Sequence, residues 1–241
     1  SGHHRDLHSF PTRRSSDLVV LAIQVTNQTT LDSLHEVFDR TTGQANLVVI
    51  PANETRQPLD QNDFEKAARI RGVEVAAPSL HIRTLLASEA DSWQIAFSLT
   101  GVAAGNFFQL DGVDPGLDPQ VRVYVLESGR MPRQGKYEVV IPAQLAAEKN
   151  LRIGDDLAVL ALEDQAELEI VGLLANEGVA ILNGGAVGFT SLDVAQDLFD
   201  RAGELDEIAL KISPSITGSP TALEAYKQEL AAMLGDRIRV V

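Results

Sequence analysis

The stretch LESGRMPRQGKYEVVIPAQLAAEKNLRIGDDLAVLALEDQAELEIVGLL, residues 126–174, changes its hydrophobic pattern several times over a short distance. Its section EVVI is typical of a buried strand, and a short helix is expected to start at Pro142 and to end before a turn at Gly154. Two strands with alternating apolar residues follow that turn. Short strands and helices in this sequence predict an α+β fold.

Similar patterns continue on the N-terminal side. ANLVVIP, residues 45–51, predicts a buried strand that ends at its proline. A helix is expected over residues 60–71, with Asp60 as N-cap, Asp63 at the N3 position and Gly72 as the stop. The other predictions on this side are strands over 73–87 and 92–102 and a loop over the Gly-, Pro- and Asp-rich residues 107–119.

The C-terminal side adds two further helices. Residues 186–203 predict a strand followed by a helix, and residues 206–212 and 237–241 predict strands. Between these two strands lies a helix with Ser219 as N-cap, Pro220 at its first position and Gly235 beyond its end.

These elements predict a split domain. Residues 44–119 plus 206–241 are expected to form one α/β sandwich lobe, and residues 120–205 a smaller α/β lobe inserted into it. Insertion of one lobe into another is plausible because the ends of a compact domain usually lie close together at its surface.

The first residues have a different character. Read back into codons, residues 4–18 resemble a widely used DNA sequencing adapter, so we interpret residues 1–18 as a disordered artefact and exclude them from the fold. This exclusion removes the histidine cluster GHHRDLH, which would otherwise suggest a zinc site. The histidines that remain are His35 and His81, and we expect both to be surface or partly buried. Residues 19–43 are expected to be the end of a first transmembrane helix and its extracytoplasmic extension.

Composition excludes several classes of function. The formal net charge of −14 argues against nucleic acid and against a polybasic membrane surface, both of which require clustered Lys and Arg. The absence of cysteine excludes disulfides, thiolate metal sites and a Cys nucleophile. No run of about 18 consecutive apolar residues occurs, so no complete membrane span is present.

Motifs for nucleotides and metals fail on spacing. GRMPRQGKY, residues 129–137, has one residue too many between its glycines for a phosphate-binding loop, and Tyr137 stands where Ser or Thr must reach magnesium. NGGAVG, residues 183–188, precedes a strand instead of following one, which argues against a dinucleotide site. Asp111, Asp114 and Asp118 do not match a calcium loop and are interpreted as a turn, with cation binding left open.

Catalytic motifs are also missing. The chain contains no G-x-S-x-G elbow and no H-E-x-x-H helix. Carboxylates that converge in space are compatible with a hydrolase, but their spacing in the sequence does not support one. We therefore expect no catalytic residue, no cofactor and no metal.

The order of several weak motifs carries a resemblance to a known family. Residues 126–174 present GR, a polar spacer, EVVI, a short helix, GD before a strand and a strand that ends IVGLL. This order resembles the extracytoplasmic core domain of MacB/FtsX-type ABC transporter permeases. Other parts of the chain are similar to further segments of that family: the start of the chain over residues 19–51, RGVEVAAP at 71–78, residues 186–212, and RIRVV at 237–241.

The resemblance implies a membrane-bound, bacterial-type permease subunit whose domain lies outside the cytoplasm and is not an enzyme. It implies three partners: a cytoplasmic ABC ATPase, a second permease subunit and the membrane, reached through flanking helices. The domain would couple ATP hydrolysis to export or to extracytoplasmic signalling, and the lipoprotein, peptide or drug class of substrate stays open. A soluble periplasmic ligand-binding module is the alternative, and a hydrolase with converging carboxylates is a third hypothesis.

Five residues are expected to have structural roles at turns or between the lobes. Gly154 can adopt positive φ, and Asp155 can bond nearby backbone amides. Gly172 suits a bulge or a close backbone approach within a strand. Gly129 and Arg130 begin the inserted lobe, where Arg130 is either a solvated surface residue or pairs with a carboxylate between the lobes.

Overall fold

A computed structural model describes residues 43–52, 57–87, 107–162 and 165–241. The strands are β1 (Leu47–Pro51), β2 (Leu59–Asp60), β3 (Val73–Leu85), β4 (Phe107–Val113), β5 (Leu126–Gly129), β6 (Glu138–Pro142), β7 (Asp156–Leu160), β8 (Gln165–Leu174), β9 (Val187–Ser191), β10 (Glu204–Leu205), β11 (Glu207–Ile212) and β12 (Ile238–Val240). The helices are α2 (Gln61–Arg69), α3 (Ala143–Lys149), α4 (Leu192–Leu198), α5 (Pro214–Thr217) and α6 (Pro220–Leu234), with 3-10 segments η1 (Asp118–Gln120) and η2 (Gly178–Gly185).

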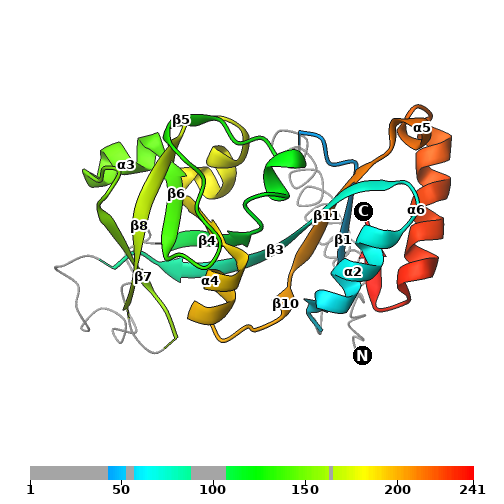
Figure 1. The fold of residues 1–241 in the computed structure, drawn as a ribbon, viewed down its shortest axis with the longest axis horizontal. Coiled ribbons are helices and arrows are strands. Elements are labelled where there is room, and N and C mark those ends of the chain that lie inside the picture. Colours follow the sequence, from blue (N-terminus) through cyan, green and yellow to red (C-terminus); the bar gives the residue numbers. More distant parts are fainter. Residues whose placement is uncertain (1–42, 53–56, 88–106, 163–164) are drawn as a thin grey trace, which may run out of the picture. The chain divides into compact units, whose positions relative to one another are not determined.

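Most of these strands belong to one mixed sheet in the order β12-β1-β11-β3-β4-β9-β6-β8-β5, with β7 paired to β8. Strand β3 connects its two halves. Its first half, from Val73 to Ser79, pairs with β11, and its second half, from Ser79 to Leu85, pairs with β4. Figure 1 shows β3 running from one half of the sheet to the other.

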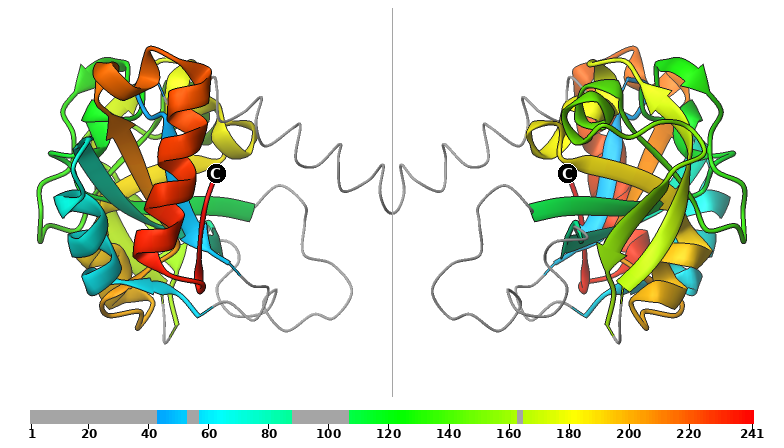
Figure 2. Two further views of the ribbon diagram at one scale, coloured as in Figure 1. Left: turned by 90° about the vertical axis from the view of Figure 1, so that its right-hand side faces the viewer. Right: turned by 90° about the vertical axis from the view of Figure 1, so that its left-hand side faces the viewer.

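The second half of the sheet closes into a barrel. Strands β3, β4, β9, β6, β8 and β7 follow one another by pairing. A bridge between Leu86 and Val159 and a hydrogen bond from the Ala87 amide to the Ala158 carbonyl join β7 back to the end of β3. Closure removes two exposed strand edges. The right-hand view of Figure 2 faces the side of the barrel that carries β7 and β8.

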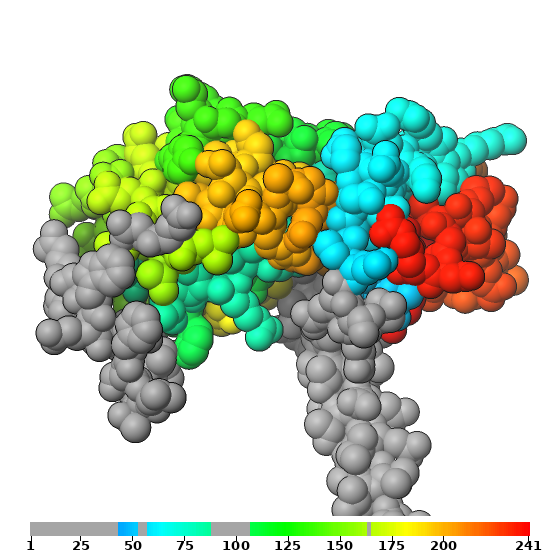
Figure 3. Space-filling model, turned by 90° about the horizontal axis from the view of Figure 1, so that it is seen from below, coloured from blue at the N-terminus to red at the C-terminus, as the bar shows by residue number. Residues whose placement is uncertain are grey.

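Helices α2 and α6 cover one face of the other half, which we call the terminal sheet and define as β12, β1, β11 and the first half of β3. Ala67 of α2 and Leu230 of α6 are fully buried against strand residues such as Ile208. The left-hand view of Figure 2 faces α6, and Figure 3 shows the residues of α2 in cyan beside those of α6 in red.

The barrel has its own apolar core. Leu80, Phe108, Leu168 and Ile170 are buried inside it with 1% exposure or less, and α4 packs against β3 and β4 through Ala195. A second pair of strands, β2 with β10, links the residues before α2 to those after α4.

The α+β fold class is confirmed, and several local predictions agree with the structure. Asp60 and Asp63 form a capping box at the start of α2, and Ser219 caps α6 with Pro220 inside its first turn. The predicted loop over 107–119 is wrong in its first half, because residues 107–113 form β4 and are held between β3 and β9. The predictions for residues 1–42 and for the strand over 92–102 lie outside the described residues.

The predicted lobe boundaries, 44–119 with 206–241 and 120–205, stay a prediction. The two cores merge along β3 in a continuous sheet, so no break in pairing marks a boundary there.

Candidate functional site

Two of the predicted structural glycines lie opposite each other in neighbouring strands. Gly129 of β5 pairs with Gly172 of β8, next to a bulge at Val171. A Cβ atom on Gly172 would lie 2.4 Å from the Arg130 carbonyl oxygen, and one on Gly129 would lie 2.3 Å from the Val171 carbonyl oxygen. The two backbones are therefore too close for any side chain at either position.

Arg130 forms a bidentate ion pair with Glu138 at the start of β6. Its two terminal nitrogens donate to the two carboxylate oxygens over 2.6 and 2.7 Å, and the Arg133 amide donates to the same carboxylate over 2.9 Å. Hydrogen bonding to Arg130 lowers the pKa of Glu138 to about 2. Both partners lie within residues 120–205, so this pair joins β5 to β6.

Gly154 and Asp155 form the turn before β7. Gly154 has a φ of 94° and its amide donates to the Ile170 carbonyl over 2.8 Å. The Asp155 carboxylate accepts from the Arg152 amide over 2.8 Å. Ile170 precedes Val171 and Gly172 in β8. Strand β8 therefore contacts both the turn at Gly154 and the chain at Gly129 and Arg130.

A second group of polar residues lies where the terminal sheet meets the barrel. We call it the junction cluster: His81, Asp111, Asp118, Arg122, Tyr124 and Glu207. Sheet register places the strand members on one face, because Ser79 lies opposite Glu207 and His81 lies opposite Asp111. Residues of η1 and the chain after it cover this face and supply Asp118, Arg122 and Tyr124.

Arg122 is the centre of the junction cluster. Its guanidinium is 8% exposed and forms ion pairs with Asp118, which is fully buried, and with Glu207 of β11. The Tyr124 hydroxyl donates to Asp118 over 2.5 Å, and the Tyr124 ring packs edge-on against Phe189 of β9 at 5.1 Å. One guanidinium thus connects the loop after β4 to the terminal sheet, and its neighbour Tyr124 contacts the barrel.

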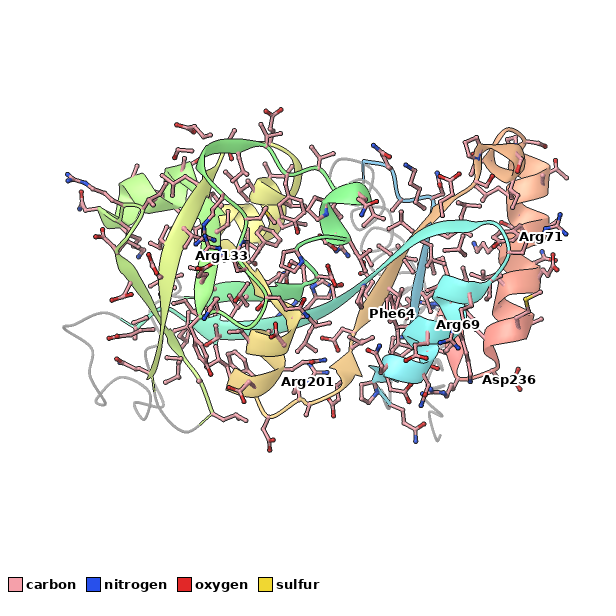
Figure 4. All side chains as sticks on the ribbon, in the orientation of Figure 1. Phe64, Arg69, Arg71, Arg133, Arg201 and Asp236 are labelled. Carbon is pink, nitrogen blue, oxygen red and sulfur yellow. The ribbon has the colours of Figure 1, made fainter. Side chains whose placement is uncertain are left out.

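His81 joins the remaining members. Its Nδ1 lies 2.8 Å from Asp111 of β4, and its Nε2 lies 3.5 Å from Glu207 of β11. The His81 amide donates to Asp206 over 2.9 Å. Asp206 is also paired with Arg201, which Figure 4 labels beside α4.

Burial and neighbouring charges have opposite effects on the pKa of His81, Asp118 and Glu207, and burial and Asp118 act in the same direction on Tyr124. Burial lowers the pKa of His81, but Asp111 and Glu207 outweigh it and raise that pKa well above its ordinary value of 6.5. Burial raises the pKa of Glu207, but Arg122 and His81 lower it to about 2. Burial raises the pKa of Asp118 against the opposing effect of Arg122. Burial and Asp118 together raise the pKa of Tyr124 well above 10.0.

Sequence reasoning missed the junction cluster because its members are up to 126 residues apart in the chain. The available signal was a charged or imidazole group inside each of three apolar strands, at His81, Asp111 and Glu207. The three aspartates that the sequence places in one loop have separate partners in the structure. Asp111 accepts from Gln109 and His81, Asp114 accepts from backbone amides, and Asp118 pairs with Arg122.

One end of the barrel carries a cavity of about 660 Å3. Phe107, Leu160 and Leu162 are exposed at its wall, where Arg83 and Phe199 also contribute. None of the junction carboxylates lines it. Within the described residues, no group of three or more His, Asp or Glu side chains is arranged to hold a metal ion.

The fold of this chain is similar to the folds of solved structures of other proteins. The periplasmic region of MacB from Actinobacillus actinomycetemcomitans superposes with a TM-score of 0.58 and 13% identity, over 85% of this chain and 91% of that one. The described part of the chain has the MacB periplasmic fold. The extracellular domain of YknZ, an ABC-type transporter from Gram-positive bacteria, shares this fold with a TM-score of 0.56 and 14% identity, over 82% of this chain and 98% of that one.

The same fold is thus found in the periplasmic region of MacB and in the extracellular domain of an ABC-type transporter from Gram-positive bacteria. No protein-family model and no curated protein sequence matches the chain. Among the described residues, no helix has the length and apolar character needed to cross a bilayer.

Proposed function

We propose that residues 44–241 form the extracytoplasmic domain of an ABC transporter permease subunit in a bacterial-type membrane, and that residues 19–43 are the end of its first transmembrane helix and the extracytoplasmic extension of that helix. The observation that carries the proposal is the near-complete coverage of the MacB and YknZ domains by this fold. The domain itself has no catalytic role in this proposal. A cytoplasmic ATPase and a second permease subunit are its partners.

The pairing of the terminal strands supports a mechanical role. Val49 of β1 lies opposite Val240 of β12, and the Val48 and Val241 amides and carbonyls bond each other over 2.8 to 2.9 Å. Chain segments that precede β1 and follow β12 therefore attach to adjacent strands. Movement of two flanking membrane helices, driven by ATP hydrolysis, would act on the terminal sheet and pass through β3 to the barrel.

Recovery of the full gene and its neighbours from the source DNA tests this proposal. Reads must span the codons for residues 18 and 241. Apolar segments of about 20 residues on both sides, beside a gene for a phosphate-binding-loop ATPase, are the expected result. Co-expression and purification in detergent then measure whether permease and ATPase form a complex. A secretory signal before residue 19 and a stop codon soon after Val241 would contradict the proposal.

The barrel cavity favours a second candidate, a periplasmic ligand-binding module. Its volume falls in the range of small-molecule sites, and its wall is largely apolar with one guanidinium from Arg83. Gene recovery distinguishes the two functions, because the module needs no membrane helix and no ATPase neighbour.

A further inference from the structure

The environment of His81 determines how many protons its ring carries. Nδ1 lies 2.8 Å from an Asp111 oxygen and Nε2 lies 3.5 Å from a Glu207 oxygen, so a carboxylate faces each ring nitrogen. A neutral imidazole donates from one nitrogen and presents a lone pair on the other. That lone pair would point at a carboxylate in either tautomer. The Ser79 hydroxyl, 3.5 Å from Nε2, can donate to this lone pair when the ring proton is on Nδ1, but only the imidazolium, with two N–H donors, donates to both carboxylates.

The charge balance of the junction cluster leads to the same conclusion. Asp111, Asp118 and Glu207 have side chains that are 3%, 0% and 21% exposed. Arg122 is the permanent cation among them, and Arg201 is engaged by Asp206 and Glu204 nearby. Buried like charges repel strongly in a medium of low dielectric constant. A second cation would reduce this repulsion, and among the described residues His81 is the other titratable base in contact with these acids.

We propose that His81 is a pH switch at the junction between the terminal sheet and the barrel: its protonated ring donates to both Asp111 of β4 and Glu207 of β11, whereas the neutral ring can donate to only one of them. Loss of one ring proton leaves one of the two carboxylates facing a lone pair and weakens the contact between the two halves of the sheet. The charged groups that face the ring from other elements are Asp111 and Glu207. Ser79 of the same strand lies 3.5 Å from Nε2, Arg122 contacts Ser79 and Glu207 without contacting the ring, and Asp206 accepts from the His81 backbone amide.

The direction of the pH effect follows from linkage. The folded-state pKa of His81 lies above the unfolded-state value of 6.5. Its contribution to stability is therefore fully present below pH 6.5 and is lost as the pH rises through the folded-state pKa. The expected result is a junction that is closed at neutral pH and looser under alkaline conditions. This inference concerns the domain alone and does not depend on the proposed transport function.

NMR of the 241-residue chain tests the protonation of His81 directly. The imidazole resonances are followed from pH 5 to 10, with His81→Gln used to assign them and His35→Gln as the matched control. A midpoint for His81 well above that of the other histidines is expected. A midpoint at or below about 6.5 would overturn the proposal. If His81→Gln does not fold, single His→Gln substitutions at the other four histidines assign the His81 resonance by elimination.

Spin labels test the conformational consequence. Because the chain contains no cysteine, pairs can be introduced cleanly. The test pair, Met233→Cys on α6 and Glu148→Cys on α3, spans the junction. The control pair, Glu148→Cys and Glu167→Cys on β8, lies within the barrel side. All three positions are exposed. The distance distribution of the first pair is expected to broaden above the His81 midpoint, and in His81→Gln at every pH, while the control stays unchanged. The switch would be refuted if the distance distribution between labels at positions 233 and 148 were the same below and above the titration midpoint of His81.

Discussion

At Gly172 the backbone of β8 touches the chain leaving β5, and this contact depends on the absence of a side chain. The Arg130 amide donates to the Val171 carbonyl over 3.0 Å, and its own carbonyl would be 2.4 Å from a Cβ on Gly172. A residue with a Cβ would push β5 away from β8. The bulge at Val171 lies directly beside this contact.

Substitution of Gly172 tests this close approach. We expect Gly172→Ala to lower the free energy of unfolding by about 3 kcal/mol, since backbone atoms would have to move. Gly154→Ala is the control, because its Cβ would have open space and only the positive φ opposes it, at a cost of about 1 kcal/mol. Urea denaturation measures both, and equal losses would show that the contact does not matter.

Glu138 gives a prediction for acid stability. Its pKa is lowered to about 2 in the folded state by Arg130, so its contribution is present above the ordinary value of 4.5 and is lost as the pH falls towards 2. Glu138→Gln should reduce stability at pH 7 by about 2 kcal/mol and flatten the pH profile between 4.5 and 2. The exposed carboxylate Glu127 of β5 provides the control as Glu127→Gln, which should leave the profile unchanged.

At the scale of elements, β3 shows how one strand serves two purposes. Residues such as Leu80 and Ile82 enter the barrel core, and the alternate residues Ser79 and His81 face the junction cluster. A shift of one residue in register would exchange these faces. It would place an imidazole among leucines and break the contacts to Asp111 and Glu207.

Helix α2 depends on its cap. Asp60 accepts from the Asp63 amide over 3.0 Å, and Asp63 accepts from the Asp60 amide over the same distance. Asp60→Ala should destabilise the chain by about 1 kcal/mol, and Asp60→Asn, which keeps an acceptor, by less. Thermal unfolding followed by circular dichroism gives the two values. If the alanine and asparagine variants were equally stable, the cap would have no role.

For the whole molecule, the shared strand predicts cooperative unfolding of the two cores. Leu230 lies in the core under α2 and α6, and Leu168 lies in the barrel core, both fully buried. Because β3 belongs to both, neither core retains a complete sheet when the other unfolds.

Core truncations measure this coupling. Leu230→Ala and Leu168→Ala should each lower stability by about 3 kcal/mol and shift one common transition, seen identically by circular dichroism and calorimetry. Met233→Ala, an exposed position on α6, should leave the transition in place. Two separate transitions, each sensitive to only one substitution, would mean that the cores unfold independently.

Local signals in the sequence determined most of the elements. Caps at Asp60 and Ser219, the proline at the start of α6 and the alternating strands of residues 126–174 all act over a few residues, so they can be read without a partner. The α+β class follows from their order. The first half of the 107–119 segment was misread because its glycine and aspartate are turn formers in isolation, and the hydrogen bonds that hold it as a strand come from β3 and β9.

Only the tertiary structure decided the barrel closure and the junction cluster. Val159 meets Leu86, and His81 meets Asp111 and Glu207, across separations that no local pattern records. The pKa of His81 belongs to the same class of property, since it results from the sum of burial and two carboxylates brought by other strands. The sequence alone determines which segments can form strands and helices. Pairing and burial in the folded molecule determine which charges meet, and hence where the chain can respond to pH.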